Sequence, residues 1–258
     1  MFKKIRIFLL LMALLIVAIG AWRDKAQATA WKYSLNVVVY PINGDDSDVS
    51  ARYIAGLTPE RFDALPSFFS TQAKRYDVHL AYDQAPVRVH VAPEVRERPP
   101  APPPNGNPLS VAFWSLKLRY WAWKHGDYAT GPGQIRMFVL YHDPALHPGL
   151  AHSLGLEKGL IGVVNAYAAP EMDGQNAFVI AHEFLHTVGA QDRYDLATTQ
   201  PLYPDGYAEP DRRPRYPQAL AEIMGGRIPR SETEATMPDS LREAVVGAKT
   251  AAEIGWSK

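Results

Sequence analysis

The sequence predicts one α/β domain, which spans residues 31–258. Three observations carry this prediction. Short apolar runs rich in β-branched residues alternate with longer runs whose apolar residues recur at helical spacing. The composition, 47% hydrophobic and 21% charged, is that of an ordinary globular protein long enough to bury a sizeable core. No internal repeat is visible along the chain.

Charge and cysteine content exclude several functions. The 27 basic and 27 acidic residues balance to a formal net charge of +0, so no strongly basic surface is available to bind a nucleic acid. The chain has no cysteine, which excludes disulfides, thiolate metal ligands and thiol nucleophiles. Any bound metal must therefore be held by His, Asp or Glu.

Residues 1–30 are predicted to be a targeting segment and not part of the fold. Three basic residues precede an apolar run from Ile7 to Trp22, and the small-residue stretch AQATA follows. Such a segment is either a cleaved signal peptide or an uncleaved N-terminal membrane anchor. Both alternatives export the rest of the chain, because positive residues ahead of the apolar run keep the N-terminus in the cytoplasm. We therefore expect an extracytoplasmic protein that is periplasmic, secreted or membrane-anchored.

The first half of the domain is predicted to contain two strands with a helix between them. The segment LNVVVYPI, Leu35 to Ile42, is typical of a buried strand, and VRVHV, Val87 to Val91, alternates like a strand with one solvated face. Thr58 and Pro59 form an N-cap and first-turn pair for a helix that is kinked or divided at Pro66. The residues expected to point inward are Phe62, Leu65, Phe68 and Phe69.

The middle of the chain begins with a proline-rich surface loop, residues 93–108, which contains RPPAPPPNGNP. The next segment, Leu109 to Lys124, predicts an aromatic helix. Its three tryptophans are expected in the core: Trp114, Trp121 and Trp123. Two further strands are expected at Gln134–His142 and Gly159–Tyr167.

The stretch AHEFLHTVGAQD, residues 181–192, carries the strongest functional signal. Asn176 can cap a helix that begins at Ala177, and His182 and His186 lie one turn apart on the same face of this helix. This is the spacing that lets two imidazoles reach one ion. Glu183, beside the first histidine, can hydrogen-bond a metal-bound water without being a ligand itself.

A catalytic zinc site needs a third protein ligand and an open fourth position. Gly189 can take the left-handed conformation that ends the helix and turns the chain back, and Asp192 would then return a carboxylate to the ion. Other carboxylates remain as alternatives: Asp195, Glu209 and Glu222. The other histidines are isolated or lie in a loop-like run, and they are expected at the surface or in a second site: His79, His90, His142, His147 and His152.

The motif HEFLHTVGAQD, residues 182–192, resembles the signature of the metzincin branch of zinc metallopeptidases. That signature is HExxHxxGxx followed by His or, in snapalysin-like members, by Asp. The resemblance implies a Met-turn beneath the metal, for which AEIMGG offers Met224, and a C-terminal helix after that turn. Ser240 to Glu243 forms an S-x-x-E capping box for this helix, and four residues follow at helical spacing: Leu241, Val245, Ala248 and Ala252.

The same resemblance implies a mixed, mostly parallel sheet with an antiparallel edge strand ahead of the active-site helix. The segment Gly159–Tyr167 stands where that edge strand is expected. One departure concerns the tyrosine that several family members carry two residues after the Met, as an extra ligand or oxyanion stabiliser. Here that position is Gly226, and three tyrosines remain as candidates for the role: Tyr194, Tyr203 and Tyr207.

Together these features predict a zinc-dependent endopeptidase. One catalytic Zn²⁺ would be held by His182, His186 and Asp192, with Glu183 as the general base on a zinc-bound water. A peptide or protein substrate would add in extended form to the strand edge at Ile161, Gly162, Val163, Val164 and Asn165. No nucleic-acid partner is expected, and a membrane is expected only at an uncleaved N-terminal segment. Two alternatives remain: an exported zinc-binding module without turnover, and an envelope interaction protein in which the motif is incidental.

Overall fold

The structure is a computed structural model that describes residues 5–8, 11–12, 15, 19–20, 26, 29–103, 106–128, 134–157 and 159–257. Most of the predicted targeting segment, residues 1–30, lies outside the described residues, so its nature stays a prediction. Within the described part of the chain, no helix is both long enough and apolar enough to cross a membrane.

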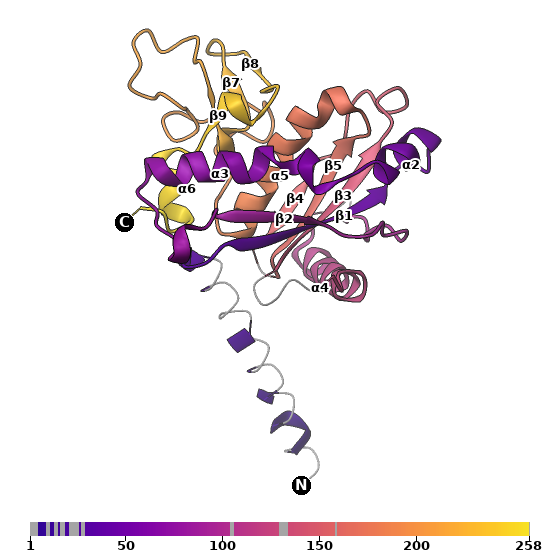
Figure 1. The fold of residues 1–258 in the computed structure, drawn as a ribbon. Helices are drawn as coiled ribbons and strands as arrows, with labels where there is room; N and C mark the ends of the chain where they lie inside the picture. The colour runs from indigo at the N-terminus through magenta and orange to yellow at the C-terminus, as the bar shows by residue number, and fades with distance from the viewer. Residues whose placement is uncertain are drawn as a thin grey trace.

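A five-stranded sheet in the order β2-β1-β3-β5-β4 forms the centre of the fold (Figure 1). β1 (Leu35–Asn43) pairs in parallel with β2 (Val87–Val91) and with β3 (Ile135–His142). β3 pairs in parallel with β5 (Ile161–Tyr167), and β5 pairs antiparallel with β4 (Leu154–Leu156). The predicted mixed, mostly parallel sheet with an antiparallel edge strand is therefore confirmed.

The edge strand itself is β4, and the prediction that Ile161–Asn165 forms the edge is wrong. Ile161 to Val163 pair with β3 on one side and with β4 on the other. Beyond β4, the N–H of Asn165 donates to the Ser153 hydroxyl at 3.0 Å. A three-residue strand is too short to show a period of two in the sequence, which explains why β4 was not expected.

Helices cover both sides of the sheet. α2 (Asp48–Ala55), α3 (Ala64–Arg75) and α5 (Asp173–Thr187) pack on one side, and α4 (Pro108–His125) packs on the other (Figure 1). Because successive residues of a strand point to opposite faces, each inner strand supplies side chains to two hydrophobic cores.

The strand β1 demonstrates why LNVVVYPI is apolar at almost every position. Val37 and Val39 enter the core that contains α3 and α5, whereas Val38 and Tyr40 enter the core under α4. A strand covered on both faces cannot alternate between apolar and polar residues, because neither face meets water.

The helix expected after Thr58 is divided as predicted, but at Asp63 and not at Pro66. Pro59–Phe62 forms a 3-10 turn, and α3 begins at Ala64. Pro66 is the third residue of α3, where a backbone N–H has no acceptor within the helix, so the proline costs no hydrogen bond there. The predicted inward residues are all buried: Phe62, Leu65, Phe68 and Phe69.

The predicted aromatic helix is α4, which is capped by the side chain of Asn107. Trp121 is 5% exposed and lies in the core, and Trp114 is half-buried beside it. Trp123 is 70% exposed, so its predicted core position is wrong. The helix is aromatic on more than one face, and a tryptophan count alone does not reveal which face meets the sheet.

The chain after α5 forms short paired strands that gather at one side of that helix (Figure 1). β6 (Ala221–Glu222) pairs in parallel with β9 (Ala244–Val245). β7 (Ile228–Pro229) pairs antiparallel with β8 (Ala235–Thr236).

The predicted C-terminal helix is present but starts later than expected. Ser240 caps only a 3-10 turn, Leu241–Glu243, and Val245 lies in β9. The helix α6 then spans Ala248–Glu253. The pairing of β9 with β6 holds residues 244–245 extended, and this pairing between distant segments overrides the local helical pattern.

Candidate metal centre

The helix α5 carries the two motif histidines, and it begins earlier than predicted. Its first residue is Asp173, and Asn176 lies inside the helix. The Asn176 side chain accepts the N–H of Tyr167 at 2.9 Å and donates to the Tyr167 carbonyl at 2.8 Å. The predicted cap at Asn176 is therefore wrong, because this residue lies inside the helix. Its side-chain amide instead hydrogen-bonds the end of β5 and so positions α5 against the sheet.

His182 and His186 present the same ring nitrogen to a shared point. The Nδ1 of His182 lies 2.9 Å from the Ile223 carbonyl, and the Nδ1 of His186 lies 2.9 Å from the Ala190 carbonyl. A carbonyl only accepts hydrogen bonds, so each Nδ1 carries a proton, and each neutral ring presents its lone pair at Nε2. Both Nε2 atoms lie 3.1 Å from Oδ1 of Asp192.

The turn that brings Asp192 back to the histidines is built on Gly189, as predicted. Gly189 has φ +110°, in the region that favours glycine. The N–H of Ala190 donates to the Leu185 carbonyl at 3.0 Å, and the N–H of Gly189 donates to the His186 carbonyl at 3.2 Å. These two bonds are the Schellman pattern that closes a helix and reverses the chain.

The donor atoms of this group fit a tetrahedral metal. Two nitrogen or oxygen ligands at about 2.0–2.1 Å from a tetrahedral zinc lie about 3.3 Å apart. The observed separations between the histidine Nε2 atoms and Asp192 Oδ1 are 3.1 Å. In both rings the second nitrogen is hydrogen-bonded to a backbone carbonyl, which is how histidine ligands are usually oriented. His182, His186 and Asp192 could therefore hold one metal ion.

Burial and the neighbouring charges shift the pKa values of His182 and Asp192 in opposite directions. Burial alone would raise the pKa of Asp192, but hydrogen bonds to His182 and His186 hold it well below its usual value. Burial alone would lower the pKa of His182, but Asp192, Glu183 and the Ile223 carbonyl together raise the pKa to about 9. The carboxylate of Asp192 therefore favours a positive charge at the point where the two Nε2 atoms converge.

Glu183 lies beside this group and is 6% exposed. Burial raises the pKa of its carboxyl group, and the two histidines oppose the shift. Its Oε2 is buried and makes no hydrogen bond to any described residue. Glu183 also lines the cleft, so this carboxylate can reach a molecule bound there.

The segment predicted as a Met-turn contacts His182. Met224 is fully buried in the 3-10 turn Ile223–Gly225, whose first carbonyl accepts from His182. The Met224 carbonyl accepts the N–H of Arg193, the residue after Asp192. The turn is therefore hydrogen-bonded to one of the three residues that could hold the metal, His182, and to Arg193, the neighbour of another.

The three alternative carboxylate ligands are engaged elsewhere. The Glu222 carboxylate accepts four hydrogen bonds, from the backbone of Met224, Gly225 and Gly247 and from the Thr250 hydroxyl. Asp195 accepts from its own loop at Ala197 and Thr198, and Glu209 pairs with Arg212.

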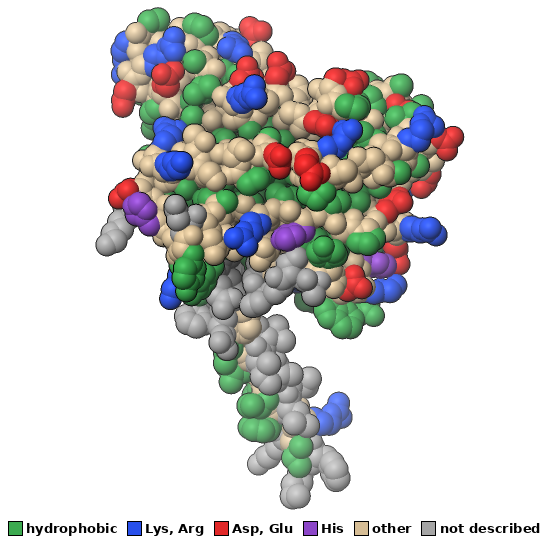
Figure 2. Space-filling view, in the orientation of Figure 1, with side chains coloured by type: hydrophobic (Ala, Val, Ile, Leu, Met, Phe, Trp, Pro, Cys, Tyr) green, Lys and Arg blue, Asp and Glu red, His purple; other side chains and the backbone are tan. Residues whose placement is uncertain are grey.

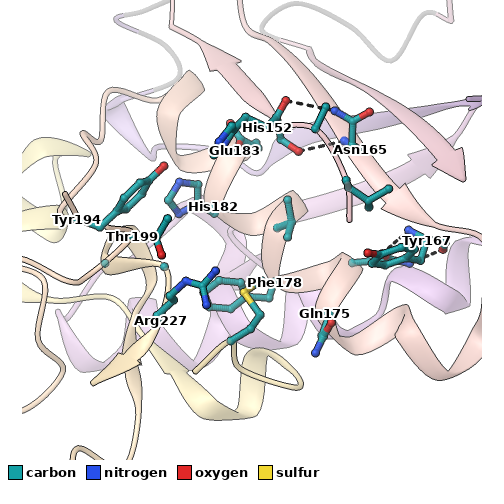
Figure 3. Close-up of a pocket in the computed structure, with 18 residues that line it drawn as sticks. His152, Asn165, Tyr167, Gln175, Phe178, His182, Glu183, Tyr194, Thr199 and Arg227 are labelled. Carbon is teal, nitrogen blue, oxygen red and sulfur yellow. Dashed lines mark hydrogen bonds between the residues drawn. The ribbon is translucent and has the colours of Figure 1, made fainter. Parts of the chain in front are cut away.

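A cleft of about 370 Å³ opens beside His182 and Glu183 (Figure 3). The loop 150–153 forms part of its lining and includes His152, so this histidine lies in the cleft and not at the expected surface or second site. The side chain of His152 lies close to Glu183 in Figure 3. No periodicity or motif marks this histidine, because its place depends on how the loop before β4 folds back over α5.

Among the three candidate tyrosines, only Tyr194 lines the cleft. Its ring centroid lies 6.1 Å from that of His182, and burial together with the Asp192 charge raises the pKa of its hydroxyl to about 12. Tyr203 is 45% exposed, and the Tyr207 hydroxyl pairs with Tyr216. Of the three tyrosines, Tyr194 is therefore the one that can contact a molecule in the cleft.

The edge strand β4 crosses the motif helix at Gly155. A Cβ added at Gly155 would lie 2.6 Å from Cβ of His186 and would also strike the carbonyl oxygen of Glu183. Only glycine allows β4 to approach α5 this closely. The free edge of the sheet therefore runs next to the candidate metal ligands.

A second group of potential ligands lies at the C-terminal end of β3. Asp45, His142 and His147 are partly buried there, and Nε2 of His147 lies 3.7 Å from Oδ2 of Asp45. The Asp45 carboxylate accepts the backbone N–H groups of Ser47 and Asp143. These bonds join the loops after β1 and β3, which gives Asp45 a structural role.

No family model matches the chain, and no curated protein matches it. The chain is similar to crystal structures of OgpA from Akkermansia muciniphila, namely the wild type in two crystal forms and the catalytically inactive protein in complex with an O-glycopeptide (glycodrosocin) substrate. The identity is 13%, the TM-scores are 0.37 to 0.39, and 86–88% of this chain is covered. The chain spans 59–62% of the length of those chains, and a likeness at this level leaves the function to be inferred from the site.

Proposed function

We propose that the protein is a zinc-dependent endopeptidase. The observation that carries the proposal is the convergence of His182 Nε2, His186 Nε2 and Asp192 Oδ1 beside the buried carboxylate of Glu183. Two imidazoles and one carboxylate, with no thiolate, form a donor set that suits zinc. Three protein ligands also leave one coordination position open, as catalytic zinc sites do.

A bound zinc would supply Lewis acidity, which polarises the scissile carbonyl and lowers the pKa of a bound water. Glu183 acts as the general base: it takes a proton from the water that attacks the carbonyl carbon. It then delivers this proton to the nitrogen of the leaving amine as the C–N bond breaks. The raised pKa of Glu183 favours the first of these transfers, because a carboxylate with a higher pKa takes up a proton more readily.

Tyr194 is proposed to stabilise the oxyanion that forms on the carbonyl oxygen. A tyrosine hydroxyl keeps its proton at neutral pH, and burial with the nearby Asp192 charge raises the pKa of this one further, to about 12. It can therefore donate a hydrogen bond to a developing negative charge. This role takes the place of the tyrosine that is absent at Gly226.

The substrate is proposed to be an extended peptide that pairs with the free edge of β4, Leu154–Leu156. Backbone pairing at a sheet edge tolerates many sequences, and the neighbouring cleft then receives individual side chains. Gly155 supports this assignment, because it holds the edge against the helix that carries Glu183.

The proposal is tested with three full-length proteins: wild type, Glu183→Gln and His186→Ala. Each is analysed for zinc and assayed on a library of internally quenched peptides. We expect wild type to bind one zinc and cleave, Glu183→Gln to keep the zinc but lose at least about 100-fold in turnover, and His186→Ala to lose both. Zinc binding without cleavage of any peptide would favour a binding module, and wild type without zinc would make the motif incidental.

We also propose that the domain acts outside the cytoplasm, on the basis of the apolar run Ile7 to Trp22 and the basic residues before it. In a bacterial host, the full-length protein is expected in the periplasmic, secreted or membrane fraction, with its bulk open to protease added to spheroplasts. An intact cytosolic chain would contradict this proposal.

A further inference from the structure

The helix α4 has an apolar face that is turned away from the sheet. Five large apolar residues on it are strongly exposed: Leu109 81%, Phe113 72%, Leu116 62%, Tyr120 64% and Trp123 70%. They are spaced by four, three, four and three residues, so they form one continuous stripe along the helix. We call these five residues the α4 stripe.

The α4 stripe is separate from the face by which α4 joins the domain. Leu118, Trp121 and Ala122 face the sheet and are at most 5% exposed. Because these residues fix the helix against the sheet, the stripe cannot rotate inward to be buried. Figure 2 shows hydrophobic side chains on the underside of the molecule, where Figure 1 draws α4. A contiguous row of exposed aromatic and aliphatic side chains indicates a surface that contacts something other than water.

The charges of α4 favour an anionic partner. The helix has no acidic residue. Besides its terminal histidine it contains three basic residues: Lys117, Arg119 and Lys124. Lys117 is exposed at the border of the stripe, and Lys124 is exposed with one ion pair, to Glu97 at 3.3 Å. In a pair of α4 helices from two copies, these like charges would flank the contact and repel each other.

We propose that the α4 stripe docks on an anionic lipid surface. Phe, Leu, Tyr and Trp on one face with Lys and Arg at the border is the composition of helices that lie flat at the boundary between headgroups and acyl chains. The tryptophan and the tyrosine suit this boundary, since each has an apolar body and a polar edge. The opposite face of α4 is held by the sheet, so the helix lies parallel to the membrane.

This docking leaves the cleft accessible. α4 covers the side of the sheet opposite to α5, whose residues line the cleft. A protein held by α4 would therefore keep the candidate metal centre away from the lipid. The proposal depends neither on the proposed peptidase activity nor on the fate of residues 1–30.

The absence of cysteine from the chain allows a site-specific test in the full-length protein. A single cysteine is introduced by Phe113→Cys and labelled with an environment-sensitive fluorophore. The matched control is Leu196→Cys, at a residue that is 76% exposed in the loop after α5. Each labelled protein is mixed with vesicles of phosphatidylcholine alone or with added phosphatidylglycerol. We expect a blue shift at position 113 on the anionic vesicles and none at position 196.

A Lys117→Glu change in the Phe113→Cys protein should weaken that vesicle response about fivefold or more, because each basic residue near an anionic surface adds to the attraction. A label at position 113 that stays in water while the protein co-floats with vesicles would overturn the proposal. Blue-shifted emission without vesicles would overturn it as well. A dependence of that emission on protein concentration would then identify a second copy as the occupant, and independence would identify another segment of the same chain.

Discussion

At the scale of single residues, two aspartates three positions apart have different surroundings. Asp192 Oδ1 lies 3.1 Å from both histidine Nε2 atoms, whereas Asp195 is exposed and accepts from Ala197 and Thr198 in its own loop. We expect Asp192→Ala to weaken zinc binding as much as His186→Ala does, by more than about 100-fold. Asp195→Ala should change it by less than about tenfold.

Competition with a chromophoric chelator measures both affinities. The Asp192→Ala protein could still bind zinc tightly while the Asp195→Ala protein does not. That result would make Asp195 the third ligand.

The charge state of His182 predicts how zinc binding depends on pH. In the metal-free protein its pKa is raised to about 9, so at pH 7 the ring carries a proton that zinc must displace from Nε2. Zinc binding at pH 7 should therefore release about one proton, and the affinity should rise about tenfold per pH unit up to about pH 9. Asp192→Asn removes the carboxylate that stabilises the proton on His182. Zinc binding to this variant should therefore release fewer protons than zinc binding to wild type.

Calorimetric titrations in two buffers with different ionisation enthalpies count the released protons. A wild-type protein that binds zinc at pH 7 without releasing a proton would show that His182 is already neutral there.

At the scale of elements, the packing of β4 on α5 depends on Gly155. A methyl group there would meet the Glu183 carbonyl and the His186 Cβ. Gly155→Ala should force the edge strand away from the helix, destabilise the fold by about 1–3 kcal/mol and lower peptidase turnover. Gly149→Ala is the matched control, because a Cβ at Gly149 meets nothing within 4 Å.

Chemical denaturation and the quenched-peptide assay are applied to both variants. Equal behaviour of the two variants would mean that β4 does not need its close approach to α5.

At the scale of the whole molecule, zinc should stabilise the fold, since its ligands converge only in the native state. The helix α5 supplies two donors, the turn after it supplies the third, and the Ile223 carbonyl orients the His182 ring. At a free zinc concentration 100 times its Kd, the native state should gain about 2.7 kcal/mol. For a chain of this size, we expect Tm to rise by about 5–10 °C.

Thermal unfolding is followed with zinc and with a chelator, in wild type and in His186→Ala. The variant should show no shift. A similar shift in both proteins would indicate that zinc stabilises the molecule through another site, such as the group of Asp45, His142 and His147.

The two surfaces for which we propose a role lie on opposite faces of the sheet. The cleft and the candidate metal centre belong to the side of α5, and the α4 stripe belongs to the opposite side. A sheet with helices on both faces can carry two such surfaces independently, because the side chains on one face are not those on the other.

The sequence by itself determined the features that depend on neighbours along the chain. The strands β1, β3 and β5 follow from apolar runs, and β2 follows from an alternation of apolar and polar residues. The histidine pair follows from a helical spacing of four. The turn at Gly189 follows from the one residue that takes a positive φ at little cost. These are local properties of the backbone, so they could be predicted without knowledge of the fold.

Only the tertiary structure decided the features that depend on distant segments. The start of α6, the position of Tyr194 in the cleft and the place of His152 all result from contacts between parts of the chain that are not neighbours in sequence. The same holds for Trp123, whose exposure depends on which face of an aromatic helix meets the sheet. The edge strand β4 is different, because it pairs with β5 only a few residues away and was missed because it is short. Side-chain periodicity reports that a helix has apolar faces, but the partner that buries each face is set by the packing of the whole chain.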